Sequence, residues 1–247
     1  AMLNQNICDE LCLIDINKER AEGEAMDLSH GLPFAPSSMK IYSGDYTDCT
    51  DMDMIVICAG VPQLEGETRR DLLQKNYKVF KTIVKPIVEN GFNGVFLVAS
   101  NPVDVMTKAV LDLSGFPPER VIGSGTSLDT ARLRYGLSEH FKVAQGNIHA
   151  YVFGEHGDTS FIPWTGAYIS GLSTDEYYEE MKAHGKDVKP LDKEAMLEYV
   201  QKSGGKVIAK KGATFYAVSA TVCQLVGLIL AASDSLATVS SLSLIHI

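Results

Sequence analysis

The sequence predicts an α/β protein in which an open parallel sheet forms the first half and mixed α and β elements form the second. Two observations predict this class. Short apolar runs alternate with helix-type segments over the first half of the chain, which favours strands joined by helical crossovers. The runs at 53–60 and 94–100 are continuously apolar, as is typical of parallel strands that are buried on both faces.

The first half yields its elements in a regular order. Residues 1–6 have the character of a helix end. Strands are expected at 10–15, 40–43, 53–60, 94–100 and 121–125, and helices at 17–28, 68–90 and 103–113. Pro86 lies inside the second of these helices and is expected to kink or divide it, because proline has no N–H to donate.

The second half shows longer helical segments. Ser127 is a candidate N-cap for a helix over 128–141, and a strand is expected at 147–153. One long, charged helix is expected over 173–211, followed by a second helix over 212–232.

The composition is that of a globular, acidic protein. With 247 residues and 45% hydrophobic residues, the chain is long enough to bury a substantial core. A net charge of −9 argues against a nucleic-acid surface, so local arginines would have to meet an anionic substrate. No signal pattern opens the chain, and the longest apolar run, 225–232, is too short to span a bilayer. Neither export nor a membrane partner is therefore expected.

The cysteines indicate a reducing compartment, which makes a cytoplasmic location the expectation. They are odd in number, form no Cys-x-x-Cys pair and lie mostly in apolar context. No histidine or second cysteine pair accompanies Cys8 and Cys12, so no metal site is expected.

A histidine between two glycines is the strongest candidate for chemistry. His156 lies within Gly154–Asp158, flanked by acids, and an imidazole exchanges protons near neutral pH. The neighbouring glycines allow the backbone to expose the ring in a cleft. The alternative is an ordinary polar turn. Suitable partner residues upstream favour proton transfer.

These partners are expected at the carboxyl ends of the strands, where open α/β sheets bind ligands. Asn101 follows one strand directly. Asp129 and Arg132 lie three residues apart on one helix face, where a carboxylate would orient an imidazole and a guanidinium would bind a substrate carboxylate. The alternative is a simple intrahelical ion pair. Asp15 ends a strand, as an acid that holds a dinucleotide ribose does, although many strands end in aspartate.

Together these motifs resemble the lactate/malate dehydrogenase family over residues 4–242. The matching stretches are LID at 13–15, AGVPQ at 59–63, GETR at 66–69, SNPVD at 100–104, GTSLDTAR at 125–132, GEHGD at 154–158 and KGAT at 211–214. Each motif is a modest signal. Their occurrence together in this order makes coincidence very improbable.

The resemblance implies a role for each matching residue. His156 would give a proton to the pyruvate carbonyl and take it back from the lactate hydroxyl. Asp129 would stabilise the protonated imidazole, and Arg132 would clamp the substrate carboxylate. Arg69 would polarise the carbonyl from a mobile loop, and Asn101 would hydrogen-bond the reacting oxygen.

The resemblance also implies NAD as the cofactor. Asp15 would hold the ribose and exclude NADP by repelling its 2′-phosphate, and Tyr46 would pack near the adenine. The cofactor-binding residues expected from the family are Asp15, Tyr46, Gly60, Val61, Ala99, Ser100 and Asn101. The implied domains are a partial Rossmann domain at 1–123 and a partial α+β substrate domain at 124–247.

Within the family, Gln63 and Thr214 favour the L-lactate dehydrogenases. An arginine at position 63 would meet the second carboxylate of oxaloacetate, whereas a neutral glutamine suits the methyl group of pyruvate. Malate dehydrogenase is the alternative. Arg134 and His149 match positions that bind fructose 1,6-bisphosphate in activated bacterial members, although either could be an ordinary surface residue. A homotetramer is the expected assembly.

The two ends depart from the family pattern. The glycine-rich turn that cradles the pyrophosphate would lie before residue 1, and residues 243–247 do not match. A fragment truncated at both ends is therefore expected. The competing hypothesis is a non-catalytic remnant that binds anions or a homologue.

Overall fold

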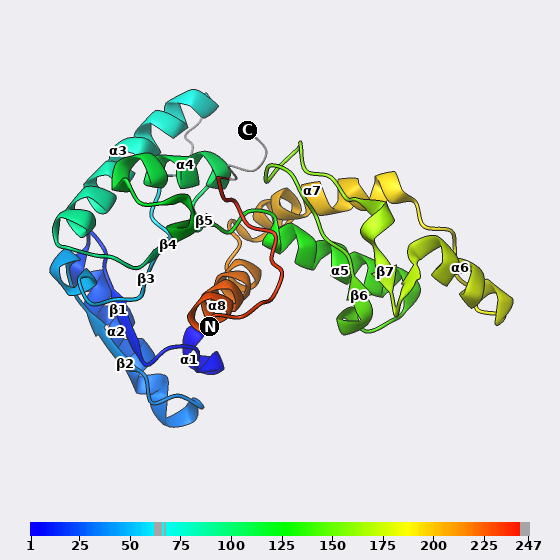
Figure 1. Cartoon of the computed structure of the whole chain (residues 1–247). Coiled ribbons are helices and arrows are strands. Elements are labelled where there is room, and N and C mark those ends of the chain that lie inside the picture. Colours follow the sequence, from blue (N-terminus) through cyan, green and yellow to red (C-terminus); the bar gives the residue numbers. More distant parts are fainter. Residues whose placement is uncertain (62–65, 67, 243–247) are drawn as a thin grey trace. The chain divides into compact units, whose positions relative to one another are not determined.

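The computed structural model describes residues 1–61, 66 and 68–242 (Figure 1). The chain divides into two compact units. The first contains Ala1–Ser124, Ser219–Leu236 and the stretch from Ser240 onward, and the second contains Gly125–Val218 and Ala237–Val239. The division of domains at residues 123 and 124 stays a prediction. Segment Ser219–Leu236 belongs with the first unit by its contacts.

The first unit has the predicted parallel strands. β1 (Glu10–Leu13) pairs with β2 (Lys40–Ser43), and β3 (Met54–Ile57), β4 (Val95–Val98) and β5 (Val121–Gly123) pair in that order. The described strands thus form two parallel sheets of two and three strands instead of one continuous sheet. The predicted fold class is confirmed.

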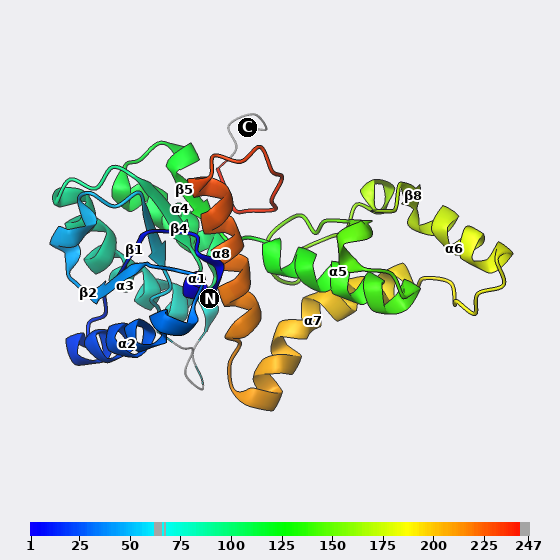
Figure 2. The ribbon, with the colours of Figure 1, turned by 90° about the horizontal axis from the view of Figure 1, so that it is seen from below.

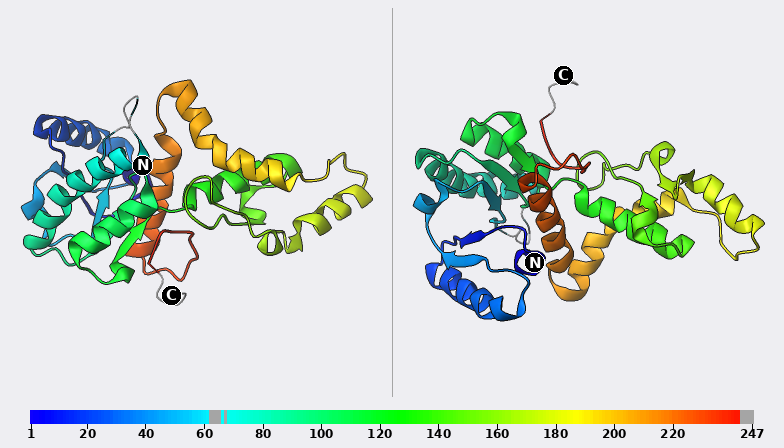
Figure 3. Two further views of the ribbon diagram at one scale, coloured as in Figure 1. Left: turned by 90° about the horizontal axis from the view of Figure 1, so that it is seen from above. Right: turned by 60° about the horizontal axis from the view of Figure 1, so that its bottom comes forward.

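Helices cover these two sheets. α2 (Lys18–Gly31) lies along the β1–β2 pair, as Figure 3 shows, and α3 (Arg69–Glu89) packs beside α4 (Val103–Ser114). α8 (Tyr216–Leu230) passes next to the residues that follow α1 (Met2–Gln5), as Figure 2 shows. Short 3-10 turns occupy Leu32–Phe34, Tyr46–Cys49, Pro118–Arg120, Gln145–Asn147 and Trp164–Gly166.

α3 continues through Pro86, so the expected division of this helix is wrong. The side chains of Phe80, Val84 and Ile87 repeat along one face of α3 and are at most 1% exposed. Burying this apolar face outweighs the one backbone hydrogen bond that proline removes near the end of the helix.

The second unit combines three helices with a small antiparallel sheet. Its helices are α5 (Ser127–Phe141), α6 (Thr174–Ala183) and α7 (Lys193–Lys211). β6 (Ile148–His149), β7 (Tyr168–Ile169) and β8 (Leu172–Ser173) pair in order. The fully buried side chains of this core include Leu133, Leu137, Phe141, Ile169 and Val200.

Two local expectations are wrong in this unit. The single helix over 173–211 is two helices, because Gly185 adopts a φ of 70° after α6 and Asp192 caps α7 by accepting from the Ala195 N–H. Ser127 does not cap α5. It is the first residue of the helix, and its hydroxyl donates to the Thr238 carbonyl over 2.7 Å.

Within the described residues, no helix combines the length and apolar character needed to cross a membrane.

Candidate functional site

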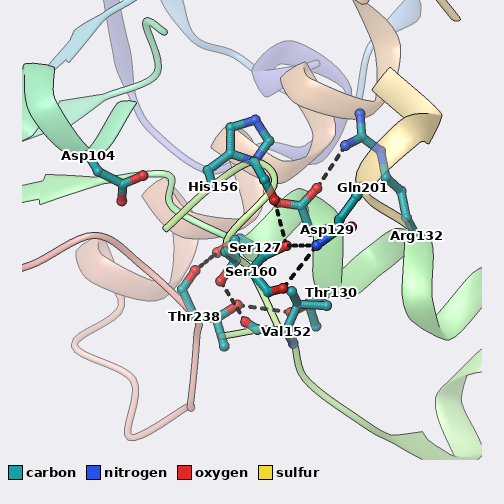
Figure 4. Close-up of polar contacts among 12 residues, drawn as sticks. Asp104, Ser127, Asp129, Thr130, Arg132, Val152, His156, Ser160, Gln201 and Thr238 are labelled. Atoms are coloured by element: carbon teal, nitrogen blue, oxygen red, sulfur yellow. Dashed lines mark hydrogen bonds and ion pairs between the residues drawn. The ribbon is translucent and has the colours of Figure 1, made fainter. Parts of the chain in front are cut away.

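The start of α5 places a carboxylate and a guanidinium on one face of the helix. Asp129 is 3% exposed, and its Oδ1 accepts from Arg132 Nη1 over 2.8 Å (Figure 4). Side chains three positions apart in an α-helix lie on the same face. The intrahelical ion pair that the spacing also allowed therefore exists, but it uses only one carboxylate oxygen.

The second oxygen of Asp129 receives the histidine. His156 Nδ1 lies 2.6 Å from Asp129 Oδ2, and the imidazole side chain is 28% exposed. A buried carboxylate at this distance favours the ring tautomer that has a proton on Nδ1. In that tautomer Nε2 is the nitrogen that accepts or donates a proton. Asp129 thus orients both His156 and Arg132.

His156 is carried by the loop Gly154–Ser160. The loop is closed at its neck by an antiparallel bridge between Phe153 and Phe161, with both N–H to carbonyl distances at 2.9 Å. Gly154 adopts a φ of 88°, a left-handed conformation that glycine accepts without strain. A short, turned loop at this point presents the ring outside any helix or strand.

A buried hydrogen-bond network fixes the segment that leads from β6 into this loop. Thr126 Oγ1 donates to the Val152 carbonyl over 2.6 Å, and the Val152 N–H donates to Thr130 Oγ1 over 2.9 Å. The Thr130 and Thr238 hydroxyls lie 3.0 Å apart. Because Thr126 and Thr130 flank Asp129 in sequence, the start of α5 holds both the carboxylate and the approach to His156.

In the first unit, several predicted cofactor residues gather after β3 and β4. The Ser100 hydroxyl donates to the Ala59 carbonyl over 2.6 Å, and the Ala99 N–H donates to the Ile57 carbonyl. Gly60 and Asn101 are exposed where they follow these strands. The carboxyl edge of the three-stranded sheet therefore presents backbone groups where such sheets bind ligands.

Asn76 joins this edge, and sequence reasoning missed it. Its side chain lies in α3 and is 1% exposed; Oδ1 accepts from the Val61 N–H over 2.8 Å, and Nδ2 donates to the Asn101 carbonyl over 3.4 Å. The available signal was its place on the helix stripe of Leu73 and Phe80. A polar residue on a core-facing stripe calls for buried partners.

The two residues expected at the adenosine end lie in the β1–β2 part of this unit. Asp15 is exposed just after β1, and its Oδ1 accepts from the Asn17 N–H over 2.8 Å, so the carboxylate is oriented while it faces solvent. Tyr46 packs against the core, and burial raises the pKa of its phenol, so it stays neutral.

The remaining predicted residues include two whose side chains lie outside the described part of the chain. Thr214 is half-buried after α7. Arg134 Nε donates to the Ala150 carbonyl over 3.1 Å and its guanidinium lies 4.8 Å from the Tyr151 ring centre, while His149 is exposed in β6. Gln63 lies outside the described residues. Arg69 begins α3, and its side chain also lies outside the described part.

These residues fit a nicotinamide dinucleotide. An exposed carboxylate, Asp15, follows β1, and the exposed residues Gly60 and Asn101 follow β3 and β4, which is the edge where open parallel sheets bind the ribose and nicotinamide ends of a dinucleotide. Among the described residues, no cluster of His, Cys, Asp or Glu is arranged to hold a metal ion.

Comparisons with known proteins agree with this organisation. Residues 1–123 match the family model of the lactate/malate dehydrogenase NAD binding domain, and residues 126–243 match the model of its alpha/beta C-terminal domain. An NAD-binding domain followed by such a domain defines a nicotinamide-dependent dehydrogenase. The chain belongs to the lactate/malate dehydrogenase family, and NAD is its cofactor.

Its relatives include several L-lactate dehydrogenases. The chain is 49% identical to an L-lactate dehydrogenase of Geobacillus sp. and 46% identical to L-lactate dehydrogenase 2 of Bacillus cereus. The alignments cover 98% of this chain and 74% and 76% of those proteins. The resemblance inferred from the motifs is thus confirmed.

Solved structures show the same likeness. A lactate dehydrogenase from a Medee basin deep-sea metagenome library superposes with a TM-score of 0.93 at 44% identity. The minor L-lactate dehydrogenase of Enterococcus mundtii, in its ligands-bound form, superposes with a TM-score of 0.92 at 36% identity. Each alignment covers 98% of this chain and 76% of the other.

Proposed function

We propose that the chain carries the active site of an L-lactate dehydrogenase that interconverts pyruvate and lactate, with His156 as the general acid and base. The observation that carries the proposal is the 2.6 Å contact between His156 Nδ1 and the buried Asp129. NAD supplies the hydride acceptor or donor when it is bound. It would be held by Asp15, Tyr46, Gly60, Val61, Ala99, Ser100 and Asn101.

The proton moves at His156 Nε2. In the reducing direction the doubly protonated ring donates from Nε2 to the carbonyl oxygen of pyruvate, and in the oxidising direction the neutral ring accepts the lactate hydroxyl proton. Asp129 stabilises the charged ring at each turnover, because its buried carboxylate faces Nδ1. Because Nε2 can both donate and accept this proton, one residue serves both directions of the reaction.

Arg132 binds the substrate carboxylate in this proposal. Nη1 donates to Asp129, and the guanidinium has further N–H groups that form the paired hydrogen bonds a carboxylate prefers. Asn101 and Arg69 contact the reacting oxygen, and Thr214 lines the substrate site. These roles follow from the motifs that the chain shares with its family.

Substrate choice rests on Gln63. A neutral amide suits the methyl end of pyruvate, and Gln63→Arg is expected to shift kcat/KM from pyruvate toward oxaloacetate, because it adds a partner for the second carboxylate. The test is NADH oxidation by the wild-type chain and the variant with each substrate. A wild-type preference for oxaloacetate would instead identify a malate dehydrogenase, and no oxidation of NADH with either would identify a non-catalytic chain.

Regulation and assembly extend the proposal. Arg134 is oriented by the Ala150 carbonyl and the Tyr151 ring, and His149 is exposed. Both residues are candidates to bind the phosphates of fructose 1,6-bisphosphate. The proposed assembly is a homotetramer that acts in the cytoplasm, in fermentative glycolysis. Pyruvate saturation curves with and without the effector test this role. Superimposable curves would count against it.

A further inference from the structure

A glutamine from α7 holds the far side of the histidine loop. Gln201 Nε2 lies 3.0 Å from the Ser160 carbonyl oxygen (Figure 4). The same nitrogen lies 3.1 Å from the Asp158 carbonyl oxygen. A third contact, to the Ser160 hydroxyl oxygen, is longer at 3.5 Å. Because the two closer acceptors are carbonyl oxygens, which cannot donate, the side chain must present its NH2 group to the loop. The orientation of the amide is therefore set by chemistry.

The loop itself is compact but strongly turned. Its neck is closed by the Phe153–Phe161 bridge, and Gly157 adopts a φ of 136°, a conformation that only glycine accepts readily. The Ser160 hydroxyl donates to the Gly157 carbonyl over 2.8 Å, which binds the loop to itself. Gln201 joins this self-bonded loop to a helix.

α7 packs closely against α5, the helix that carries Asp129. α7 packs on α5 where Gly136 has no side chain: a Cβ at this position would lie 2.7 Å from the Met196 sulfur and 3.1 Å from the Tyr199 ring. Close-packed helices move little relative to one another. A loop fixed to α7 is thus fixed relative to Asp129 on α5.

The histidine loop is consequently held from both ends. Thr126 and Thr130 bind Val152 before the loop, and Gln201 of α7 binds Asp158 and Ser160 after His156. The imidazole lies between these two anchors. Loss of either anchor would let the loop backbone move and carry the ring away from Asp129.

We propose that Gln201 is a positioning residue that holds the His156 loop so that the imidazole stays bonded to Asp129 in the reactive orientation. The proposal rests on the proton-transfer role of His156 given above. Gln201 touches neither substrate nor cofactor in this account. It acts through the loop backbone, and its removal should lower kcat and leave KM for pyruvate nearly unchanged, because Arg132 keeps its own partner.

The test compares four variants of the full chain. Gln201→Met keeps the length without a donor, and Gln201→Glu places a carboxylate against two carbonyl oxygens. Gln201→Arg restores N–H donors. Lys202→Met is the matched control, because Lys202 neighbours Gln201 in α7 and pairs with the exposed Glu198 on the same helix.

Steady-state kinetics with NADH and pyruvate give the first readout. The Met and Glu variants are expected to lose roughly ten- to a hundredfold in kcat, as a displacement of about 1 Å does in other sites. KM should stay within about twofold, and Gln201→Arg should recover most of the loss. An active wild type with equally active Met and Glu variants would overturn the role of Gln201.

Two further readouts do not depend on turnover. Backbone amides of residues 154–160 should exchange with solvent faster in Gln201→Met than in Lys202→Met, and the downfield proton resonance of an imidazole bonded to a carboxylate should weaken. Unchanged exchange and an unchanged resonance would overturn the clamp. If the wild type does not oxidise NADH with pyruvate, the proposed function fails, and these two measurements still decide whether Gln201 positions the loop.

Discussion

The replacement Asp129→Asn is the most informative change in the second unit. It keeps the shape of a side chain that is 3% exposed and removes its charge. Arg132 has only donors and therefore claims the amide oxygen, which turns the amide NH2 toward His156 Nδ1. The ring must then accept at Nδ1, so the neutral form has its proton on Nε2.

This tautomer is wrong for the reaction. Nε2 no longer has a lone pair for the lactate hydroxyl proton, and the protonated ring loses the carboxylate that stabilised it. General acid and base catalysis contributes about 10²–10⁴-fold, so kcat should fall by that factor. Arg132, with a side chain 16% exposed, keeps a hydrogen bond to the amide oxygen but loses its charged partner, so the free energy of unfolding should fall by less than the roughly 1.5–3 kcal/mol of a complete hydrogen bond to a charged group.

The assay is NADH oxidation with pyruvate, measured well below the melting temperature and paired with a thermal melt. Asp175→Asn is the control, because Asp175 forms an exposed ion pair with Lys193 in the same unit. The control should retain activity and stability. An Asp129→Asn variant within about threefold of the wild-type kcat would refute the tautomer argument.

Two further predictions concern stability. Gly205 lies exposed inside α7, and among the described residues no neighbouring side chain comes within 4 Å of where a methyl group would be added. Gly205→Ala should therefore raise the free energy of unfolding, measured in a urea titration, by about 0.5–1 kcal/mol. A lower free energy of unfolding would show that the position is constrained. The hydrogen bond from the Ser173 hydroxyl lowers the pKa of Glu176 most, and the bond from the Ser173 N–H lowers it further. The ionised Glu176 carboxylate therefore stabilises the fold above about pH 4.3, and this effect is lost as the pH falls through the lowered pKa. The Tm difference between wild type and Glu176→Gln should therefore be present at pH 7 and vanish in acid; a difference independent of pH would contradict the capping role.

Local patterns were enough to predict most of the fold. The apolar run that becomes β4 is paired on both sides and largely buried, and such a run has few alternatives to a parallel strand. The i,i+3 spacing of Asp129 and Arg132 likewise predicted their contact, because helix geometry alone brings them together. The glycines around His156 indicated an exposed loop.

Features that depend on distant contacts were not predictable in the same way. Gln201 lies 45 positions after His156, and nothing in its sequence neighbourhood indicates that it binds the histidine loop. The continuity of α3 through Pro86 depends on burial of one helix face in the core, and the role of Asn76 depends on two loops meeting beside it. Each is set by tertiary packing, which local propensity does not describe.

The most direct measurement is the ratio of kcat for NADH-dependent pyruvate reduction between the wild-type chain and His156→Gln, with NADH binding followed separately by fluorescence. A proton donor at His156 predicts a fall of about 10²–10⁴-fold in kcat with NADH affinity unchanged. Equal turnover by the two proteins would contradict the account, because the Asp129–His156 pair would then have no part in the reaction.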